Sequence, residues 1–243
     1  MLITQSFSGF LLIRCFYEEV VKTMFIDVNG VKLYYEVKGV GRPLIMIHGN
    51  SEDHTIFDVA SEILKEYFTV YLLDSRDHGQ SEKMSGELHY SDFADDVVAF
   101  LSALDLNDVL YYGFSDGGII GLLVAIKTDR VSRMIISGTN LTPAGVVPWM
   151  KLMIKAMYLF TKDHKMKMML TEPNIDPTCL KGIHIPTTVI VGEKDAVTYT
   201  ETKEIADNIP NAKLIIVPKA GHGSYIVHKP DIAEMILKET GTK

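Results

Sequence analysis

The chain has 243 residues, of which 47% are hydrophobic and 23% charged, which is typical of a globular domain and not of a disordered or fibrous protein. Its net charge of −7 argues against a nucleic-acid partner, because phosphates would be repelled and no Lys/Arg cluster offsets the average. No apolar run reaches the roughly 20 residues of a spanning helix, so we expect no membrane partner. Two cysteines, Cys15 and Cys179, make neither a disulfide framework nor a zinc spacing, which favours reduced thiols in the cytoplasm.

The first 23 residues differ from the rest of the chain. Ser8 to Ile13 is apolar, but Arg14 interrupts the run and no Lys or Arg precedes it, so we do not expect a secretory signal. Met24 opens a stretch that has the pattern of a domain start. We interpret residues 1–23 as an extension outside the fold, arising from a mis-assigned translation start. A short docking strand or helix is the alternative.

From Met24 onward, short apolar runs alternate with amphipathic stretches. Asn29-Gly30 predicts a hairpin turn between strands at 25–29 and 31–38. Further strands are expected at 44–47, 68–73, 109–112, 134–136, 188–191 and 214–217, and helices at 54–66, 91–104, 116–127, 200–209 and 230–239. This alternation predicts an α/β fold with a mostly parallel sheet that helices cover on both faces.

One segment, residues 141–182, interrupts the alternation and contains no predicted strand. It holds six of the chain's 12 methionines and its only tryptophan, so we interpret it as a small helical cap on a core of residues 24–140 and 183–243. Met150, Met153, Ile154 and Met157 recur at helical spacing. We expect Trp149, Met153 and Met157 to contact substrate. The alternative is that this stripe only packs the cap onto the core.

The segment from Gly113 to Gly117, Gly-Phe-Ser-Asp-Gly, follows a predicted strand and opens a predicted helix. This is the setting of a nucleophile elbow, in which glycines permit a tight turn that exposes the serine hydroxyl. A chance Gly/Ser-rich turn is the alternative, and the strand–turn–helix context argues against it. Ser115 is therefore the candidate nucleophile.

A serine nucleophile needs a base and an acid that orients the base. His222 lies in a loop after the last predicted strand, where a side chain can reach the carboxyl edge of the sheet. Asp195 follows the neighbouring strand and is the candidate acid, with Glu193 as its competitor. The chain order is Ser115, Asp195, His222.

Two backbone N–H groups should stabilise a developing oxyanion. We expect one from Asp116, directly after the nucleophile, and one from Asn50 in the His48-Gly49-Asn50 loop. His48 as a catalytic histidine is an alternative to a structural role in that loop. The Asp116 carboxylate is expected to face away and to interact with the helix N-terminus.

Five ordered motifs resemble those of the α/β-hydrolase superfamily, over nearly the full length from Met24: His48-Gly49, Asp74 to Ser81, Gly113 to Gly118, Gly192 to Asp195 and Gly221-His222. The resemblance implies the α/β-hydrolase fold and a Ser-His-Asp triad. Two features depart from it, namely Asp77 at a usual glycine position and a short cap. The haloalkane dehalogenase and epoxide hydrolase branches have aspartate at the nucleophile position, so a serine there argues against both.

These residues together predict acyl transfer in two steps, through an acyl-enzyme on Ser115 that water hydrolyses. The expected substrate is a small-molecule ester with a small or medium apolar acyl group, and the mechanism implies no metal or cofactor. Hydrolysis of a carbon–carbon bond in a dienoic diketone is a second possibility. A non-catalytic receptor or scaffold that retains the hydrolase fold is a third.

Overall fold

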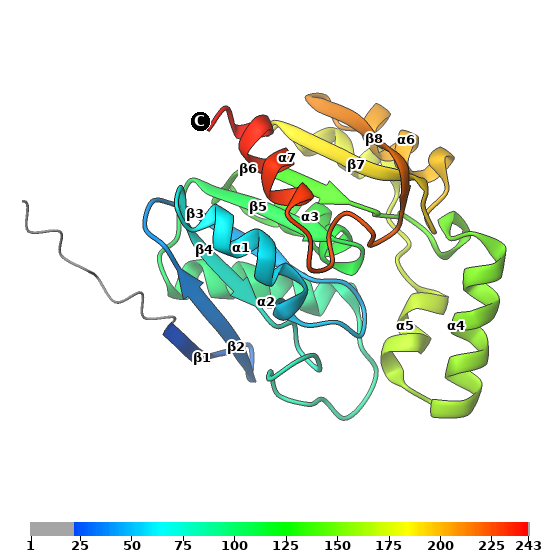
Figure 1. Ribbon diagram of the computed structural model, residues 1–243. Coiled ribbons are helices and arrows are strands. Elements are labelled where there is room, and N and C mark those ends of the chain that lie inside the picture. The colour runs from blue at the N-terminus through cyan, green and yellow to red at the C-terminus, as the bar shows by residue number, and fades with distance from the viewer. Residues whose placement is uncertain (1–21, 243) are drawn as a thin grey trace, which may run out of the picture.

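In the computed structural model, which describes residues 22–242, eight strands form one sheet in the order β1-β2-β4-β3-β5-β6-β7-β8 (Figure 1). The strands are β1 (Lys22–Val28), β2 (Val31–Lys38), β3 (Arg42–Ile47), β4 (Phe68–Leu73), β5 (Val109–Phe114), β6 (Val131–Ser137), β7 (Thr187–Lys194) and β8 (Ala212–Gly221). β2 pairs antiparallel with β1 and β4, and all the other pairs are parallel. The predicted fold class is confirmed.

Helices cover both faces of this sheet: α1 (Asp58–Leu64) and α7 (Asp231–Thr240) on one, α2 (Tyr90–Ala103), α3 (Asp116–Lys127) and α6 (Tyr199–Asn208) on the other. The position of β5 in the middle of the sheet explains why its sequence is continuously apolar. Tyr111 packs into the cluster beneath α2 and α3, whereas Tyr112 packs into the cluster beneath α1 and α7. Because both side-chain directions are buried, the strand has no polar alternation.

The start of the fold differs slightly from the expected Met24, because Lys22 and Thr23 already pair in β1. The rest of the predicted N-terminal extension, residues 1–21, lies outside the described residues. The predicted helix 54–66 is divided into a 3₁₀ turn, η1 (His54–Phe57), and α1, with the Asp53 carboxylate capping the turn at Thr55 N–H. Within residues 22–242 no helix is long and apolar enough to cross a membrane.

Residues 141–182 contain two α-helices and two 3₁₀ turns, namely η2 (Pro143–Gly145), α4 (Pro148–Thr161), α5 (His164–Thr171) and η3 (Pro177–Gly182). α4 and α5 lie side by side at one edge of the molecule, beyond the carboxyl ends of the strands (Figure 1). Lys162, at φ +56°, ends α4, and the Asp163 carboxylate accepts the Lys165 N–H to begin α5. We call α4 and α5 the cap.

Candidate active site

Ser115 occupies the turn between β5 and α3 with a strained backbone, φ +53° and ψ −113°. The flanking glycines are required by close contacts. A β-carbon on Gly113 would lie 2.2 Å from the Gly117 carbonyl oxygen, and one on Gly117 would lie 2.1 Å from the Ile47 carbonyl oxygen. The turn therefore has the form of the predicted elbow, with the serine at the carboxyl edge of the sheet.

The structure brings together the three residues predicted as a triad. His222 Nε2 lies 3.0 Å from Ser115 Oγ, and His222 Nδ1 lies 2.6 Å from Asp195 Oδ1. β7 and β8 are neighbours in the sheet, so their terminal loops carry Asp195 and His222 to one place. The competing acid, Glu193, is exposed and accepts the Lys219 N–H instead.

The Asp195 carboxylate is held ready to orient the histidine. Its side chain is almost fully buried, and it also accepts the backbone N–H groups of Gly192 and Val197. Burial opposes its ionisation, but the His222 hydrogen bond and these amides outweigh that effect and lower the pKa of Asp195. Because a carboxylate only accepts, the His222 proton lies on Nδ1 and the Nε2 lone pair faces the serine hydroxyl.

Within the described residues, the backbone N–H groups of Asn50 and Asp116 have no hydrogen-bond acceptor. Both residues line the pocket that contains Ser115, so both amides are available to an oxyanion. His48 is engaged elsewhere. It is buried, its Nδ1 lies 2.8 Å from the Gly49 carbonyl oxygen, and its Nε2 accepts the Ser75 N–H. It therefore has the structural role in its loop.

The Asp116 side chain does not face away from the site, as expected from the sequence, but forms part of the pocket wall. Its carboxylate accepts the Tyr90 hydroxyl at 2.8 Å and the Asn50 Nδ2 amide at 2.9 Å. Burial raises the pKa of Asp116 to about 6, although both hydrogen bonds favour the charged form. Tyr90 is a site residue that the sequence did not reveal.

The cap contributes Met150 and Ile154 of α4 and Met169 of α5 to the apolar part of the pocket, and the rest comes from Phe114, Val146, Ala196 and Val197. Met153 and Met157, which we expected to contact substrate, are 45% and 43% exposed and are not among the residues that line the pocket. Trp149, which is 63% exposed, is likewise outside it. The structure therefore divides the predicted stripe: Met150 and Ile154 face the pocket, and Met153 and Met157 face solvent.

Glu52 is a further pocket residue that no motif indicated. It accepts the Gly49 N–H at 3.0 Å. A β-carbon on Gly49 would lie 2.6 Å from Glu52 Oε2 and 3.1 Å from Ser115 Cβ, so the carboxyl and the serine are close neighbours. Burial raises the pKa of Glu52 to about 7. The side chain is therefore partly protonated near neutral pH.

The pocket has a distinct charge character. Three carboxyl groups line it, those of Glu52, Asp116 and Glu172, whereas no lysine or arginine among the described residues does. The Glu172 carboxylate is held by His89 Nδ1 at 2.6 Å and by the Tyr90 N–H. A carboxylate-bearing ligand would find no lysine or arginine partner among the described residues of this lining.

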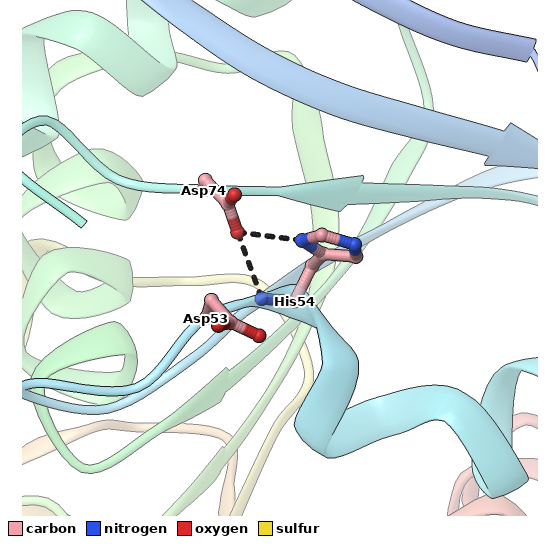
Figure 2. A group of neighbouring side chains, drawn as sticks. All are labelled: Asp53, His54 and Asp74. Carbon is pink, nitrogen blue, oxygen red and sulfur yellow. Dashed lines mark hydrogen bonds and ion pairs between the residues drawn. The ribbon is translucent and has the colours of Figure 1, made fainter. Parts of the chain in front are cut away.

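A second polar cluster, Asp53, His54 and Asp74, places three potential ligand atoms within 4.8 Å of one another. Figure 2 shows the backbone nitrogen and Nδ1 of His54 both directed at Asp74 Oδ1, each at 2.8 Å. Asp74 Oδ2 accepts the Gln80 N–H. These N–H donors occupy the carboxylate, so the cluster fits an anchor for the loop that carries Asn50 better than a metal site.

Comparison with known proteins agrees with this geometry. A sequence profile of the α/β hydrolase fold matches residues 42–164, about half of the chain. The chain is 24% identical over 257 residues to 2-hydroxy-6-oxo-6-(2'-aminophenyl)hexa-2,4-dienoic acid hydrolase of Metapseudomonas resinovorans, covering 88% of this chain and 89% of that protein.

Two solved structures have similar folds over nearly their whole length. An enol-lactonase from Burkholderia xenovorans LB400 superposes with a TM-score of 0.76 at 22% identity, over 90% of this chain and 100% of that one. A thermophilic esterase from Thermogutta terrifontis superposes with a TM-score of 0.73 at 23% identity, over 90% of this chain and 98% of that one. At these identities the likeness shows the shared fold.

Proposed function

This chain belongs to the α/β-hydrolase family, and we propose that it is a serine hydrolase that cleaves uncharged carboxylic esters with small or medium apolar acyl groups. The observation that carries the proposal is the hydrogen-bonded series Ser115–His222–Asp195, which opens into a pocket with one apolar wall. The fold that this chain shares with an esterase and a lactonase is compatible with this reaction class.

In the proposed first step, Ser115 Oγ attacks the ester carbonyl carbon and His222 Nε2 takes the hydroxyl proton. Negative charge develops on the carbonyl oxygen, where the N–H groups of Asn50 and Asp116 can stabilise it. Asp195 stabilises the imidazolium. The tetrahedral intermediate then collapses, the bond to the leaving oxygen breaks, and His222 returns the proton to that oxygen. An acyl-enzyme and a free alcohol result.

In the second step, His222 takes a proton from water, and the resulting hydroxide attacks the acyl carbon. The second intermediate expels Ser115 Oγ, which recovers the proton from His222, and the carboxylic acid product leaves. The product carries a negative charge into a pocket lined by the carboxyls of Glu52 and Glu172. Repulsion from those groups favours its release.

The charge of the pocket is our reason for preferring ester hydrolysis to carbon–carbon bond hydrolysis. The relative from Metapseudomonas resinovorans is named for a dienoic acid substrate, which carries a carboxylate at neutral pH. In this chain such a group would face the carboxyls of Glu52, Asp116 and Glu172 with no lysine or arginine among the described lining residues. That juxtaposition disfavours an anionic substrate.

A receptor or scaffold function would not need Ser115, His222 and Asp195 in hydrogen-bonding geometry, and this chain keeps that geometry. We therefore favour catalysis. The pocket also has the mixture of apolar wall and convergent polar groups that small-molecule sites have.

The test compares matched substrates at pH 8. We expect kcat/KM for p-nitrophenyl butyrate to exceed that for the p-nitrophenyl ester of glutaric acid, which adds a carboxylate, by about tenfold or more. A dienoic keto acid should show no turnover. Faster cleavage of the dienoic acid than of the neutral ester would refute the proposal.

A further inference from the structure

The side of α4 that turns away from the pocket is apolar and exposed. Six of its side chains, which we call the outer face of α4, point to solvent: Trp149, Leu152, Met153, Met157, Leu159 and Phe160. At 100° per residue they cover about 160° of the helix circumference, and only Ala156 falls between them. No polar side chain interrupts the face.

The exposure is large for a surface helix. Phe160 is 90% exposed, Leu152 70% and Trp149 63%. The two aromatic rings alone leave on the order of 300 Å² in water, taking about 200 Å² for each side chain. Apolar patches of this size on a monomer mark surfaces that bind something.

The charges on α4 indicate what that partner is. Lys155 lies beside the Leu159 edge of the outer face, whereas Lys151 and Lys162 lie further round the helix, with Lys162 Nζ over the Tyr158 ring. α4 contains no acidic residue, in a chain whose net charge is −7. Lysines beside an apolar face can extend their ammonium groups to anionic headgroups while the apolar side chains enter the lipid. Packing two copies of this face together would cover the apolar side chains but would leave the α4 lysines without neutralising carboxylates from α4.

We propose that the outer face of α4 docks onto an anionic phospholipid surface. The position of α4 at the edge of the molecule leaves this face free to meet a flat surface (Figure 1). The inner face of the same helix lines the pocket with Met150 and Ile154, so docking brings one wall of the pocket close to the lipid. The docking does not depend on the proposed hydrolase function.

This inference departs from the expectation of no membrane partner, which we drew from the lack of an apolar run long enough to span a bilayer. A helix that lies on a membrane needs neither that length nor uniform apolarity. It needs an apolar face and nearby cations, and α4 has both.

The chain contains one tryptophan, and Trp149 lies on the proposed contact, so its fluorescence reports docking directly. The full-length protein is titrated with vesicles of phosphatidylcholine alone, and with vesicles of equal parts phosphatidylcholine and phosphatidylglycerol. We expect a blue shift of the emission with the anionic vesicles only, and a weaker response as salt is raised. An unshifted emission, or an equal shift with neutral vesicles, overturns the proposal.

Variants test whether vesicle binding comes from this face or from another part of the chain. Phe160→Ser combined with Leu152→Ser should weaken cosedimentation with anionic vesicles by about tenfold or more. Val40→Ser, at a side chain 88% exposed between β2 and β3, is the matched control and should bind like the parent. Undiminished binding by the double variant overturns the proposal.

The lysines are tested separately. Lys155→Glu should lower the affinity for anionic vesicles, whereas Lys181→Glu, exposed in η3, should change it less. Sedimentation velocity without lipid tests the alternative occupant, a second copy of the chain. A dimer that the Phe160→Ser variant dissociates, together with no vesicle binding, overturns the proposal in favour of self-association.

Discussion

Lys165 Nζ of α5 lies 2.7 Å from Asp77 Oδ2, so an ion pair joins the cap to the loop after β4. Asp77 stands at the position where the sequence departs from the usual glycine. The backbone nevertheless keeps a left-handed conformation there, with φ +60°. Asp77 Oδ1 also accepts the Met84 N–H. The departure therefore leaves the loop conformation intact and adds a link to the cap.

Asp77→Asn should destabilise the protein by about 1–3 kcal/mol, because Lys165 is left half-buried without its main partner. Burial opposes ionisation of Asp77, but the bonds from Lys165 and Met84 lower its pKa. Because the pKa of Asp77 is lower in the folded than in the unfolded protein, its carboxylate stabilises the fold at pH values above the unfolded-state pKa. That stabilisation is lost as pH falls through the folded-state pKa. Urea unfolding should therefore show the difference at pH 7 and not well below about pH 4.

A double-mutant cycle with Lys165→Met isolates the coupling of the pair. The exposed pair of Lys203 and Asp207, with side chains 49% and 59% accessible, is the matched control. Asp207→Asn should cost less than about 0.5 kcal/mol. A coupling for Asp77 and Lys165 no larger than that would contradict a structural link between cap and core.

Ser115→Ala should abolish labelling by a fluorophosphonate and lower kcat by roughly 10⁴-fold or more, because Ser115 is the nucleophile that adjoins His222 Nε2 among residues 22–242. The loss should come without unfolding, since alanine fits wherever serine does. Mass spectrometry of the labelled peptide and a thermal melt check the two claims. Labelling that persists in the variant would place the nucleophile elsewhere.

Asp195→Asn should lower kcat by roughly 10³–10⁴-fold, because an amide no longer fixes the His222 tautomer or stabilises its cation. Glu193→Gln is the control, and its effect should be small, since Glu193 is exposed and contacts the Lys219 backbone. Turnover of nitrophenyl acetate by the two variants decides the matter. The reverse ranking would make Glu193 the orienting acid.

Much of the fold and of the triad could be predicted because both depend on short sequence patterns. Apolar runs mark the strands, and the elbow and the two loops each follow one of them, at the edge where parallel strands end. Glu52, Tyr90 and Glu172 could not be found this way. They come from the loop after β3, the start of α2 and the end of the cap, and only the paths of those segments bring them to one pocket.

The orientation of α4 is the clearest failure of periodicity. Met150 and Ile154 are four residues apart, and so are Met153 and Met157. Since the helix is apolar around most of its circumference, either stripe could have faced the core. In the structure α4 packs against α5 with the first pair turned toward the pocket, and no spacing in the sequence distinguishes the two pairs.

Glu52→Gln should raise stability at neutral and alkaline pH. Burial raises the pKa of Glu52 in the folded protein to about 7. Its protonated side chain therefore contributes to the stability of the parent below the pKa of the unfolded chain, and that contribution is lost as pH rises through the folded-state pKa. Glutamine has no proton to lose and can still accept the Gly49 N–H. Relative to the parent, the variant should gain about 1–3 kcal/mol between about pH 4 and pH 8.

The measurement is urea unfolding across that pH range. Glu204→Gln, exposed on α6, is the control, and its difference from the parent should not change with pH. The same Glu52 variant should also cleave the glutaric acid ester faster than the parent does above pH 7, because one negative charge has left the pocket. A pH-independent difference from the parent would mean that Glu52 ionises as an exposed carboxyl does.

The last prediction concerns acyl-chain preference, which the inner face of α4 should control. Met150 and Ile154 line the pocket that contains Ser115, so truncating either to alanine enlarges the apolar part of that pocket. Longer acyl chains can fill that space, whereas short chains lose contacts. We expect Met150→Ala and Ile154→Ala to shift preference from butyrate toward octanoate esters, each by about 1–3 kcal/mol in the ratio of kcat/KM.

Met153→Ala and Met157→Ala are the matched controls, since they remove the same kind of side chain from the outer face of the same helix. They should leave the ranking of acetate, butyrate and octanoate unchanged. Thermal melts separate specificity from packing, because Ile154 is only 3% exposed and its truncation will also cost stability. A ranking that changes with Met153 or Met157, and not with Met150, would mean that α4 presents the opposite face to the substrate in solution.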